Sequence, residues 1–474
     1  MEREARRKVL GATTTVATQP VNPIAPVDPV RKGIAPCEFL SWPEEGHKMV
    51  HNGDPMVMVP LEGVLSRENL QVSWMAVKAN RGAAGVDGMG IDQTRVHLLE
   101  HWDRIEAKLL VGTYKPAAVR AVDIPKANGG TRGLGIPTVQ DRLIQQAIHQ
   151  QLSPVWEREF SEHSYGFRPG RSAHDAVRAA RGFVQGGKAW VVDIDLKSFF
   201  DEVNHDILMQ RVRGHVQDNR LLRLIGNYLR APMQEQDGRR HKRTKGTPQG
   251  GPLSPLLANL YLDPLDKELE RRGMSFVRYA DDIAIFVSSE RSAQRVLDSV
   301  IRWIEKHLKV PVNRTKSGSG PTDHSALLGF RLYTDGRLGV SPKAVERLKC
   351  RVRELWDAQQ SLRSVELRNQ WQRYITGWWN YFQLADWRRE VEDLSGWIRR
   401  HMRKCFWIRW KTPRGRINAL RRLGVRKRAL GMAYTGQGAW PVARHWVMHH
   451  ALDNATLARY GLTVPWDSAP AALR

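Results

Sequence analysis

The pattern of apolar and polar positions predicts a β-hairpin with an acidic tip in the middle of the chain. Residues 275–280 and 283–287 are two short runs rich in β-branched and aromatic residues, separated by one tight turn. Such runs predict a pair of antiparallel strands. The turn carries Asp281 and Asp282, whose like charges repel unless a cation lies between them. A plain turn with two acidic residues is the alternative that this stretch alone leaves open.

A third apolar run, residues 190–196, predicts a buried strand upstream of the hairpin. Because side chains alternate across a strand, Asp193 and Asp195 lie on the same face of it. An acidic residue at a strand end, beside the hairpin pair, would form the oxygen-rich environment that Mg²⁺ prefers. Two such ions, about 3.5–4 Å apart, would serve nucleotidyl transfer, one activating a 3′-hydroxyl and the other holding a triphosphate.

Longer periodic patterns predict helices in the C-terminal part of the chain. Apolar residues recur at helical spacing over residues 342–362, 365–385 and 387–410, which predicts a bundle of three helices. The second helix carries a stripe of aromatic residues at i, i+3, i+7 and i+10, namely Trp371, Tyr374, Trp378 and Tyr381. Such a stripe favours packing inside the bundle over stacking on nucleic-acid bases.

Charge is the part of the composition that restricts the function most. The chain has 74 Lys and Arg against 49 Asp and Glu, a formal net charge of +25 and a pI near 10.3. A charge of this size predicts an anionic partner rather than a fold. No window of about 18 apolar residues occurs and no basic amphipathic helix stands out, so nucleic acid is favoured over a membrane surface.

The positive charge is concentrated near the C-terminus, where residues 394–452 contain no Asp or Glu. A solvated surface normally mixes both signs, so phosphate is the expected counter-charge. The nucleic-acid-binding candidates in this stretch are five cations, Arg421, Arg422, Arg426, Lys427 and Arg428. Trp407, Trp410 and Trp440 also lie among cations and are candidates for base stacking.

These residues make the chain resemble the reverse transcriptases encoded by bacterial group II introns. Asp195, with an aromatic residue five positions later, is similar to the first catalytic aspartate of the polymerase palm, and the Tyr-Ala-Asp-Asp sequence at 279–282 matches the signature hairpin of the family. The resemblance implies that Asp195, Asp281 and Asp282 are the catalytic residues and that they bind two Mg²⁺ ions. Asp193 is then expected to support the fold around them.

Further positions that match the family are expected to contact the incoming dNTP. Residues 124–137 resemble a fingers hairpin, and residues 245–255 resemble a loop that approaches the nucleotide. The substrate-binding positions implied in this way are Lys126, Arg132, Phe200, Gln249, Gly250 and Lys316. The ring of Phe200 would lie under the sugar and select dNTPs over rNTPs; taken alone, Phe200 reads more simply as a core residue. Solvated hairpin charges are the alternative for Lys126 and Arg132, but their match to the family favours the functional role; Lys316 could be only a loop cation.

Arg168 and Arg171 lie in a Tyr-Gly-Phe-Arg-Pro-Gly-Arg sequence that matches another conserved block of the resembled family. They either contact the phosphates of the template or primer, or brace the turn in which they lie. A helix is expected to begin near Ser172, because serine is a favoured N-cap residue.

The resemblance covers residues 65–462 and implies an α+β fold with the right-hand polymerase arrangement. We expect an N-terminal extension over residues 1–55, fingers and palm over 56–335, a three-helix thumb or maturase (X) domain over 336–411, and a basic DNA-binding-like region over 412–474. The implied function is to bind group II intron RNA, to assist its splicing, and to copy it into DNA from a primer during retrohoming. The sequence does not specify an oligomeric state.

Cysteine usage separates the chain from many members of the resembled family. These carry a C-terminal His-Asn-His nuclease with paired cysteines, whereas Cys37, Cys350 and Cys405 are isolated and no CxxC sequence occurs. His449 and its neighbours lack a nearby acid, so a helix face is favoured over a metal site. We therefore expect a nuclease-lacking lineage and a reducing, cytoplasmic location in a prokaryote.

Two alternatives to an intron-encoded polymerase remain. The first is a reverse transcriptase that works without an intron, in DNA repair or phage defence. The absence of a folded ribozyme around the gene would distinguish this enzyme from an intron-encoded one. The second is a non-catalytic RNA-binding splicing cofactor on an inactive polymerase fold. The presence of all three candidate metal-binding aspartates argues against the second alternative.

Overall fold

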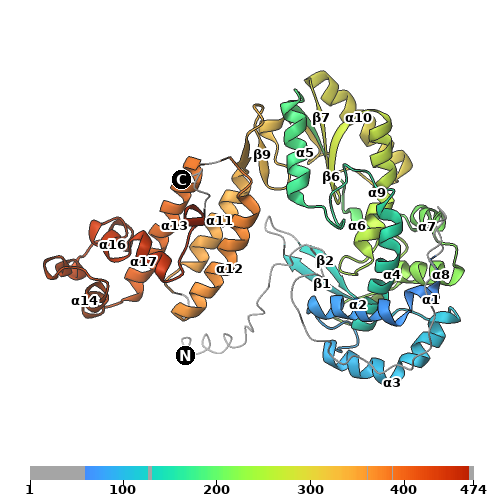
Figure 1. Ribbon diagram of the computed structural model, residues 1–474, viewed down its shortest axis with the longest axis horizontal. Helices are drawn as coiled ribbons and strands as arrows, with labels where there is room; N and C mark the ends of the chain where they lie inside the picture. The colour runs from blue at the N-terminus through green and yellow to red at the C-terminus, as the bar shows by residue number, and fades with distance from the viewer. Residues whose placement is uncertain (1–58, 126–130, 360, 387, 469–474) are drawn as a thin grey trace, which may run out of the picture.

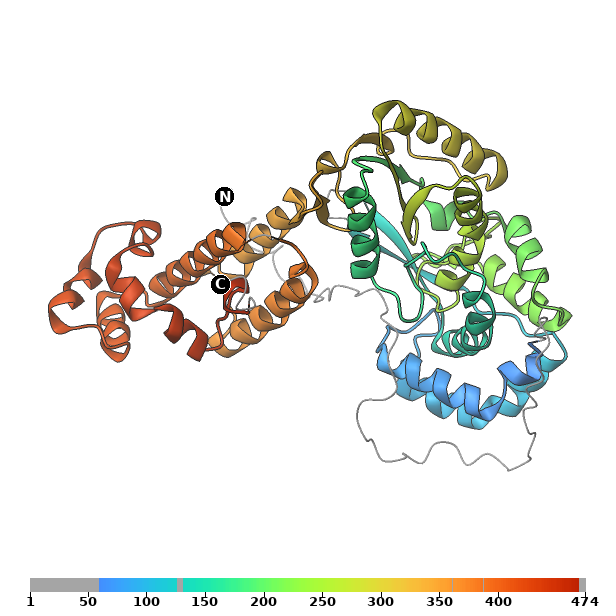
Figure 2. The same cartoon turned by 45° about the horizontal axis from the view of Figure 1, so that its top comes forward.

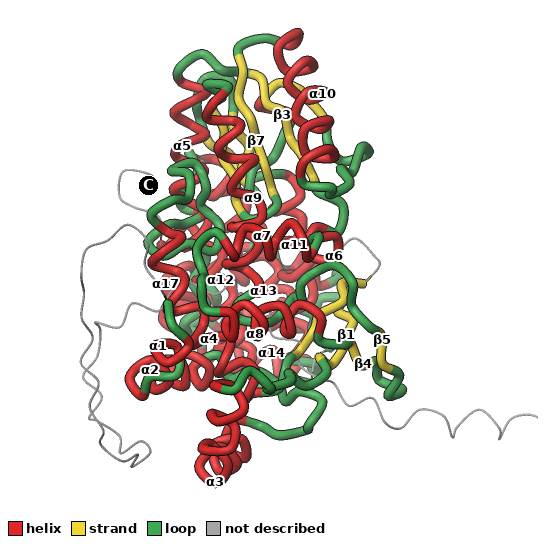
Figure 3. The backbone as a smooth tube through the Cα atoms, turned by 90° about the vertical axis from the view of Figure 1, so that its right-hand side faces the viewer, coloured by secondary structure: helices red, strands yellow, loops and turns green. Residues whose placement is uncertain are grey.

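The computed structural model describes residues 59–125, 131–359, 361–386 and 388–468. The chain forms two bodies, an N-terminal body over residues 59–340 and a C-terminal body over residues 341–468, which lie side by side and meet at one end (Figures 1 and 2). The N-terminal body mixes helices with two separate groups of strands, whereas the C-terminal body is helical throughout its described residues (Figure 3). The expected α+β fold is confirmed.

The central sheet of the N-terminal body has the strand order β6-β7-β3-β8, and every neighbouring pair is antiparallel. Its strands are β3 (Trp190–Asp195), β6 (Ser275–Tyr279), β7 (Asp282–Val287) and β8 (Gly318–Pro321). Val192 and Ile194 pack into a core with α9 (Ser254–Arg271) and α10 (Glu290–His307), while Val191 packs on the opposite face with α5 (Ala173–Gln185). Both faces are therefore covered, which explains why the strand sequences are apolar almost throughout.

A second sheet and a group of helices form the lower half of the N-terminal body in Figure 1. The sheet order is β2-β1-β4-β5, with β1 (Val119–Pro125), β2 (Thr131–Ile136), β4 (Met233–Gln234) and β5 (Arg240–His241). The helices are α1 (Leu61–Val64), α2 (Arg67–Ala79), α3 (Ile91–Leu110), α4 (Val139–Glu157), α6 (Phe199–Glu202), α7 (His205–Arg213) and α8 (Asn219–Arg230). Strands β1 and β2 form the predicted hairpin, whose tip at residues 126–130 lies outside the described residues.

The C-terminal body contains the three predicted helices, α11 (Pro342–Leu355), α12 (Ser364–Phe382) and α13 (Arg388–Arg409). The first helix ends at Leu355, earlier than expected. The predicted packing of the aromatic stripe on α12 is confirmed at Trp371, which is fully buried with its ring 5.6 Å from that of Trp356. Tyr374, Trp378 and Tyr381 are half-buried. Short elements follow: α14 (Pro413–Arg422), η2 (Lys427–Tyr434), α15 (Ala439–Val442), α16 (Trp446–Ala451), α17 (Asn454–Arg459) and α18 (Pro465–Ser468).

The two bodies are joined through the β9–β10 hairpin (Phe330–Leu332 and Leu338–Val340) and the end of α12. The Tyr381 hydroxyl donates to the Leu328 carbonyl at 2.8 Å, and the Tyr381 carbonyl lies 2.7 Å from His174 Nε2 on α5. Arg181 also pairs with Asp386 at 3.0 Å. The domain boundary expected at residue 335 falls inside this hairpin, and the extension expected over residues 1–55 lies outside the described residues. None of the described helices is long and apolar enough to span a bilayer.

Candidate active site

Strand pairing brings the predicted acidic residues together at one end of the central sheet. In the β3–β7 register Asp195 lies directly opposite Asp282, and Asp281 occupies the turn between β6 and β7. Directly opposed residues on antiparallel strands have Cβ atoms about 4.5–5.5 Å apart. Carboxylates at that spacing repel one another, and a cation between them relieves the repulsion, so this end of the sheet is suited to a cation.

The donor chemistry of this group fits Mg²⁺, which prefers carboxylate oxygens. Across the described parts of the chain, no three His, Cys, Asp or Glu side chains already stand as a group that could hold a metal ion. Asp195 and Asp282 are nevertheless accessible, the first half-exposed and the second exposed. The geometry therefore provides adjacent carboxylates that a divalent ion and its bound water or phosphate could reach.

Asp195 is held by the segment that follows β7 and α10. The backbone N–H of Asp195 donates to Ser317 Oγ at 3.0 Å, and its carbonyl accepts from the Asn313 N–H at 2.8 Å. Lys316 Nζ lies 3.7 Å from Asp195 Oδ2. Lys316 was expected to contact phosphate, and the structure places this exposed ammonium beside the candidate metal-binding carboxylate.

Asp193 differs from Asp195 in its surroundings although both lie on the same strand face. Its carboxylate accepts a hydrogen bond from the Ser325 hydroxyl. Burial raises the pKa of Asp193 to about 6, because desolvation penalises its charged form, and the Ser325 hydrogen bond only partly offsets this. This environment agrees with the expectation that Asp193 supports the fold.

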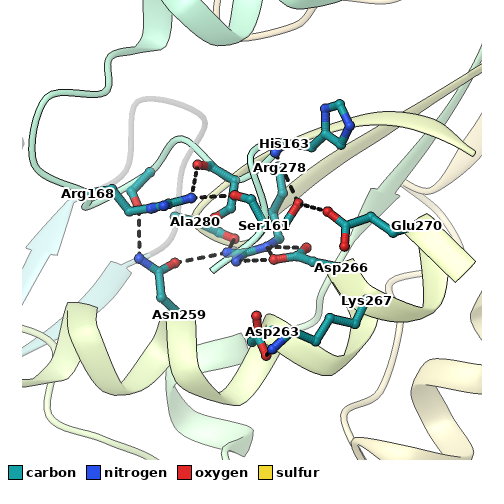
Figure 4. Close-up of polar contacts among 12 residues, drawn as sticks. Ser161, His163, Arg168, Asn259, Asp263, Asp266, Lys267, Glu270, Arg278 and Ala280 are labelled. Atoms are coloured by element: carbon teal, nitrogen blue, oxygen red, sulfur yellow. Dashed lines mark hydrogen bonds and ion pairs between the residues drawn. The ribbon is translucent and has the colours of Figure 1, made fainter. Parts of the chain in front are cut away.

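A buried cation lies directly beneath the acidic turn (Figure 4). The Arg278 side chain is fully buried and donates to both carboxylate oxygens of Asp266, from Nε at 2.7 and 3.0 Å and from Nη2 at 2.6 Å. Its Nη1 donates to Asn259 Oδ1 and to the Ala280 carbonyl, both at 3.0 Å. Ala280 has φ 56°, a left-handed conformation that costs a non-glycine residue energy. Arg278 therefore fixes a strained turn in place.

The loop before α5 packs against the same turn. A Cβ atom on Gly166 would lie only 2.2 Å from the Ala280 nitrogen, so only glycine allows this approach. Asn259 Nδ2 donates to the Gly166 carbonyl at 2.8 Å, and the Tyr165 N–H donates to the Arg278 carbonyl at 2.8 Å. The acidic turn is thus supported on two sides.

The loop at residues 245–255 connects the two sheets. The Thr247 N–H donates to the Phe200 carbonyl at 2.7 Å, and the Gly135 N–H on β2 donates to the Gln249 carbonyl at 2.8 Å. Gly250 has φ 132°, and a Cβ atom there would lie 2.5 Å from the Gly135 carbonyl oxygen. Gln249 and Gly250, two predicted nucleotide contacts, therefore lie between β2 and the start of α6.

Phe200 is the second residue of α6, the short helix that follows β3 along the chain. Its half-buried ring packs edge to face against the buried Phe199, with centroids 5.3 Å apart. Phe200 thus combines a core contact with partial exposure, five positions after Asp195 in the sequence. Of the two fingers cations, Lys126 lies outside the described residues; the backbone of Arg132 pairs with Ile124 in the β1–β2 ladder, and its side chain is not described.

The structure favours the second alternative for Arg168 and Arg171, that they brace the turn. Arg168 is only 3% exposed; its Nη2 lies 2.7 Å from Glu157 Oε1, and its Nη1 donates to the Ser164 carbonyl at 2.9 Å. Arg171 pairs with Glu162 and donates to the Glu162 carbonyl at 2.7 Å. Their hydrogen-bonding capacity is used inside the protein, because each guanidinium faces a carboxylate.

The five predicted RNA-binding cations of the C-terminal body are exposed, unlike Arg168, and form no ion pair with any described residue, unlike both Arg168 and Arg171. Arg421, Arg422, Arg426, Lys427 and Arg428 are all exposed, and within the part of the chain that the structure describes none of them is ion-paired with a carboxylate. The stacking role expected for Trp407 is wrong, since this ring is 1% exposed and covered by the Arg416 guanidinium at 4.4 Å. Trp440 is partly exposed between Arg400 and Arg444.

Several residues that organise the site were not anticipated, above all Arg278, Asp266, Asn259 and Ser317. Arg278 carries a usable signal: it is a charged residue within an otherwise apolar strand, and such a residue needs a buried partner. The sequence could not identify that partner, because Asp266 lies on α9 and contacts Arg278 only in the folded chain.

An acidic hairpin at the end of an antiparallel sheet, a glycine-rich loop between the two sheets and a basic helical body are the features of right-hand nucleic-acid polymerases. A family model described as reverse transcriptase (RNA-dependent DNA polymerase) matches residues 124–332. A second model, described as group II intron, maturase-specific domain, matches residues 345–424.

Curated relatives agree with these models. Protein YkfC of Escherichia coli (strain K12) is 32% identical over 310 residues, covering 55% of this chain and 81% of YkfC. Group II intron-encoded protein LtrA of Lactococcus lactis subsp. cremoris is 38% identical over 208 residues, covering 44% of this chain but only 34% of LtrA. Among solved structures, a chain of a partial Cas6-RT-Cas1–Cas2 complex has a TM-score of 0.34 and 24% identity, covering 52% of this chain and 41% of that chain.

The chain belongs to the reverse transcriptase family that carries a group II intron maturase-specific domain. It is an RNA-directed DNA polymerase, as the resemblance implied. The region that matches the maturase model begins in α11 and ends after α14, so it includes the three-helix bundle and the first cations of the exposed group.

Proposed function

We propose that this reverse transcriptase binds the RNA of a group II intron, assists its splicing and copies it into DNA during retrohoming. The opposed Asp195 and Asp282 carboxylates support the copying step. The exposed, unpaired cations of the C-terminal body support the binding of RNA. The partners are thus the intron RNA, an RNA template with a DNA primer, and dNTPs, in a prokaryotic cytoplasm or ribonucleoprotein particle.

Asp195, Asp281 and Asp282 are the residues that would hold two Mg²⁺ ions. When bound, such ions lower the pKa of an attacking 3′-hydroxyl and neutralise charge on the triphosphate. Lys316, beside Asp195, adds a positive charge that attracts phosphate. Arg278 keeps the acidic turn in its left-handed conformation, and Phe200 presents a flat ring to the sugar.

A charge-neutral substitution tests the assignment of the acidic residues. Asp282→Asn keeps the shape of the side chain and removes its charge, so Mg²⁺-dependent incorporation of dNTPs on an RNA template should fall about 100-fold or more, since several kcal/mol of transition-state stabilisation are lost. The control is Asp103→Asn on the exposed face of α3, which should be fully active. Unchanged incorporation by Asp282→Asn, with RNA binding intact in both variants, would refute the metal assignment.

The intron-independent alternative keeps the polymerase and changes only its RNA. Sequencing the DNA around the gene separates the two, because an intron-encoded enzyme lies inside a sequence that folds as a group II ribozyme. The nuclease-lacking lineage remains a prediction from the isolated cysteines, of which Cys350 is exposed and Cys405 buried.

A further inference from the structure

A cavity of about 350 Å³ lies in the C-terminal body, lined by residues of the three-helix bundle, of α14 and of the segment around α17. Figure 1 shows these short helices at the end of the bundle away from the N-terminal body. The cavity has the size of a small-ligand pocket. About half of its lining is aliphatic, and the rest includes aromatic rings and two guanidinium groups, namely Trp356, Phe406, Trp410, Tyr460, Arg368 and Arg422. This composition differs from an ordinary packing defect, which would be lined by aliphatic side chains alone.

One buried donor in the lining has no acceptor. Trp356 is 1% exposed, and its indole Nε1–H makes no hydrogen bond with any residue that the structure describes. In the same bundle the Trp371 indole donates to the Thr463 carbonyl at 2.8 Å, so an indole here can be satisfied by the protein. A buried donor without a partner is costly. The nitrogen itself has almost no accessible surface, so a ligand's carbonyl oxygen would satisfy Trp356 once the indole turns toward the cavity.

The charges at the cavity predict an anionic ligand. Among the described residues neither Arg368 nor Arg422 forms an ion pair with a carboxylate. Arg422 also belongs to the exposed group of unpaired cations, so the cavity opens beside a strongly positive surface. Tyr460 is 55% exposed at the rim and presents its ring to solvent. Aromatic rings, a free N–H donor and unpaired guanidinium groups together match a nucleotide.

We infer that this cavity binds an unstacked base of single-stranded RNA. The base stacks on the aromatic lining with Tyr460 at the rim, a base carbonyl accepts from Trp356, and Arg368 and Arg422 contact the flanking phosphates. A base inside a duplex is already paired and stacked, so the site distinguishes single-stranded from double-stranded RNA. The inference rests on the proposed RNA-binding function and names the kind of RNA that this part of the surface takes.

The experiment compares two exposed tyrosines of the C-terminal body. Tyr460 lines the cavity, whereas Tyr434 is 68% exposed and is not part of the lining. The full chain is titrated with a 5-iodouridine-containing 12-nucleotide single strand and with a duplex RNA of equal length. Tyr460→Ala should weaken binding of the single strand about 5- to 160-fold, the range for loss of one base–aromatic stack, and should leave duplex binding unchanged. Tyr434→Ala should change neither.

A second variant and a crosslinking experiment test independently whether the base lies in the cavity. Trp356→Phe keeps an aromatic ring and removes the N–H, so single-strand affinity should fall about 2- to 10-fold. Ultraviolet crosslinks from the 5-iodouridine should map to peptides that contain cavity residues. Equal losses on single strand and duplex, equal effects of the two tyrosine variants, or crosslinks confined to peptides outside the cavity would each overturn the inference. If the unmodified chain binds neither the single strand nor the duplex, that result would instead contradict the proposed function.

Discussion

The two bodies of this reverse transcriptase use positive charge in different ways. In the N-terminal body the arginines around the acidic turn are paired with acids: Arg278 with Asp266 in the core, and Arg168 with Glu157 under a loop. In the C-terminal body residues 394–452 contain no acid, and the five cations from the end of α14 onward are exposed and form no ion pair among the described residues. The same residue type therefore holds the acidic turn in one body and is left available for phosphate in the other.

The largest expected effect comes from breaking the buried pair of the N-terminal body. Arg278→Met leaves the Asp266 carboxylate buried without its partner, which should lower the free energy of unfolding by about 3–5 kcal/mol. Chemical denaturation followed by circular dichroism measures this change. A loss below about 1 kcal/mol would show that Asp266 reaches water or another donor in the variant.

The double variant Arg278→Met with Asp266→Leu separates stability from positioning. It removes both charges, so most of the lost stability should return. Incorporation of dNTPs should remain low, because the Ala280 carbonyl still lacks its donor and the strained turn is no longer held. Full recovery of activity along with stability would mean that Arg278 serves the fold alone.

The complementary change in the C-terminal body should affect binding and not folding. Replacing Arg421, Arg422, Arg426, Lys427 and Arg428 by Ala should reduce the slope of log affinity against log salt by up to about 3.5 on single-stranded RNA, since each phosphate contact contributes about 0.7. The free energy of unfolding should stay within about 0.5 kcal/mol, as expected for exposed positions.

A matched control is available in the N-terminal body. Arg271 and Arg272 are also cations at the end of a helix, but both pair with Glu268 at 2.7 Å. Replacing them by Ala should leave the salt slope unchanged. Equal slopes for the control and the cluster variant would remove the unpaired cations from the RNA interface.

The contrast also explains what the sequence could and could not predict. Local patterns were sufficient for the strand that carries Asp195, the acidic hairpin and the three-helix bundle, because each depends on the periodicity of its own segment. Long-range pairing was not predictable. Arg168 was expected to have either of two roles until its contact with Glu157 on α4 settled its environment, and Trp407 was assigned to the surface because its sequence neighbours are cations, although its ring faces the core.

A smaller effect is expected from pH, and it concerns the unbalanced charge of the C-terminal body. His401 is buried against Trp397 and Trp440; burial, aided by the cations Lys404, Arg353 and Arg400, lowers its pKa to about 4. A histidine whose pKa is lower in the folded state contributes stability above its unfolded pKa, near 6.5, and this is lost as the pH falls toward 4.

At pH 5 this loss should reach about 2 kcal/mol relative to pH 8. His401→Phe keeps an aromatic ring in place and cannot be protonated, so the variant should lose correspondingly less stability between the two pH values. His307→Phe, at an exposed position on α10, is the control and should retain the pH dependence of the unmodified chain. Parallel pH profiles for all three proteins would contradict the assignment.

The smallest effect tests whether the two bodies are held together by the contact at their junction. The Tyr381 hydroxyl donates to the carbonyl of Leu328, a residue in the left-handed conformation with φ 51°. Burial raises the pKa of Tyr381 to about 12, so the donor proton is present throughout the neutral range. Tyr381→Phe should lower the free energy of unfolding by about 1 kcal/mol and should accelerate amide exchange in the β9–β10 hairpin, because the Leu328 carbonyl loses the hydrogen bond that holds its turn.

Tyr374→Phe is the matched control on the same helix, since the Tyr374 hydroxyl makes no hydrogen bond with any described residue. If the amide protons of the β9–β10 hairpin exchange at the same rate in both variants, the junction depends on ring packing. The Tyr381 hydroxyl then does not couple the N-terminal body to the C-terminal body.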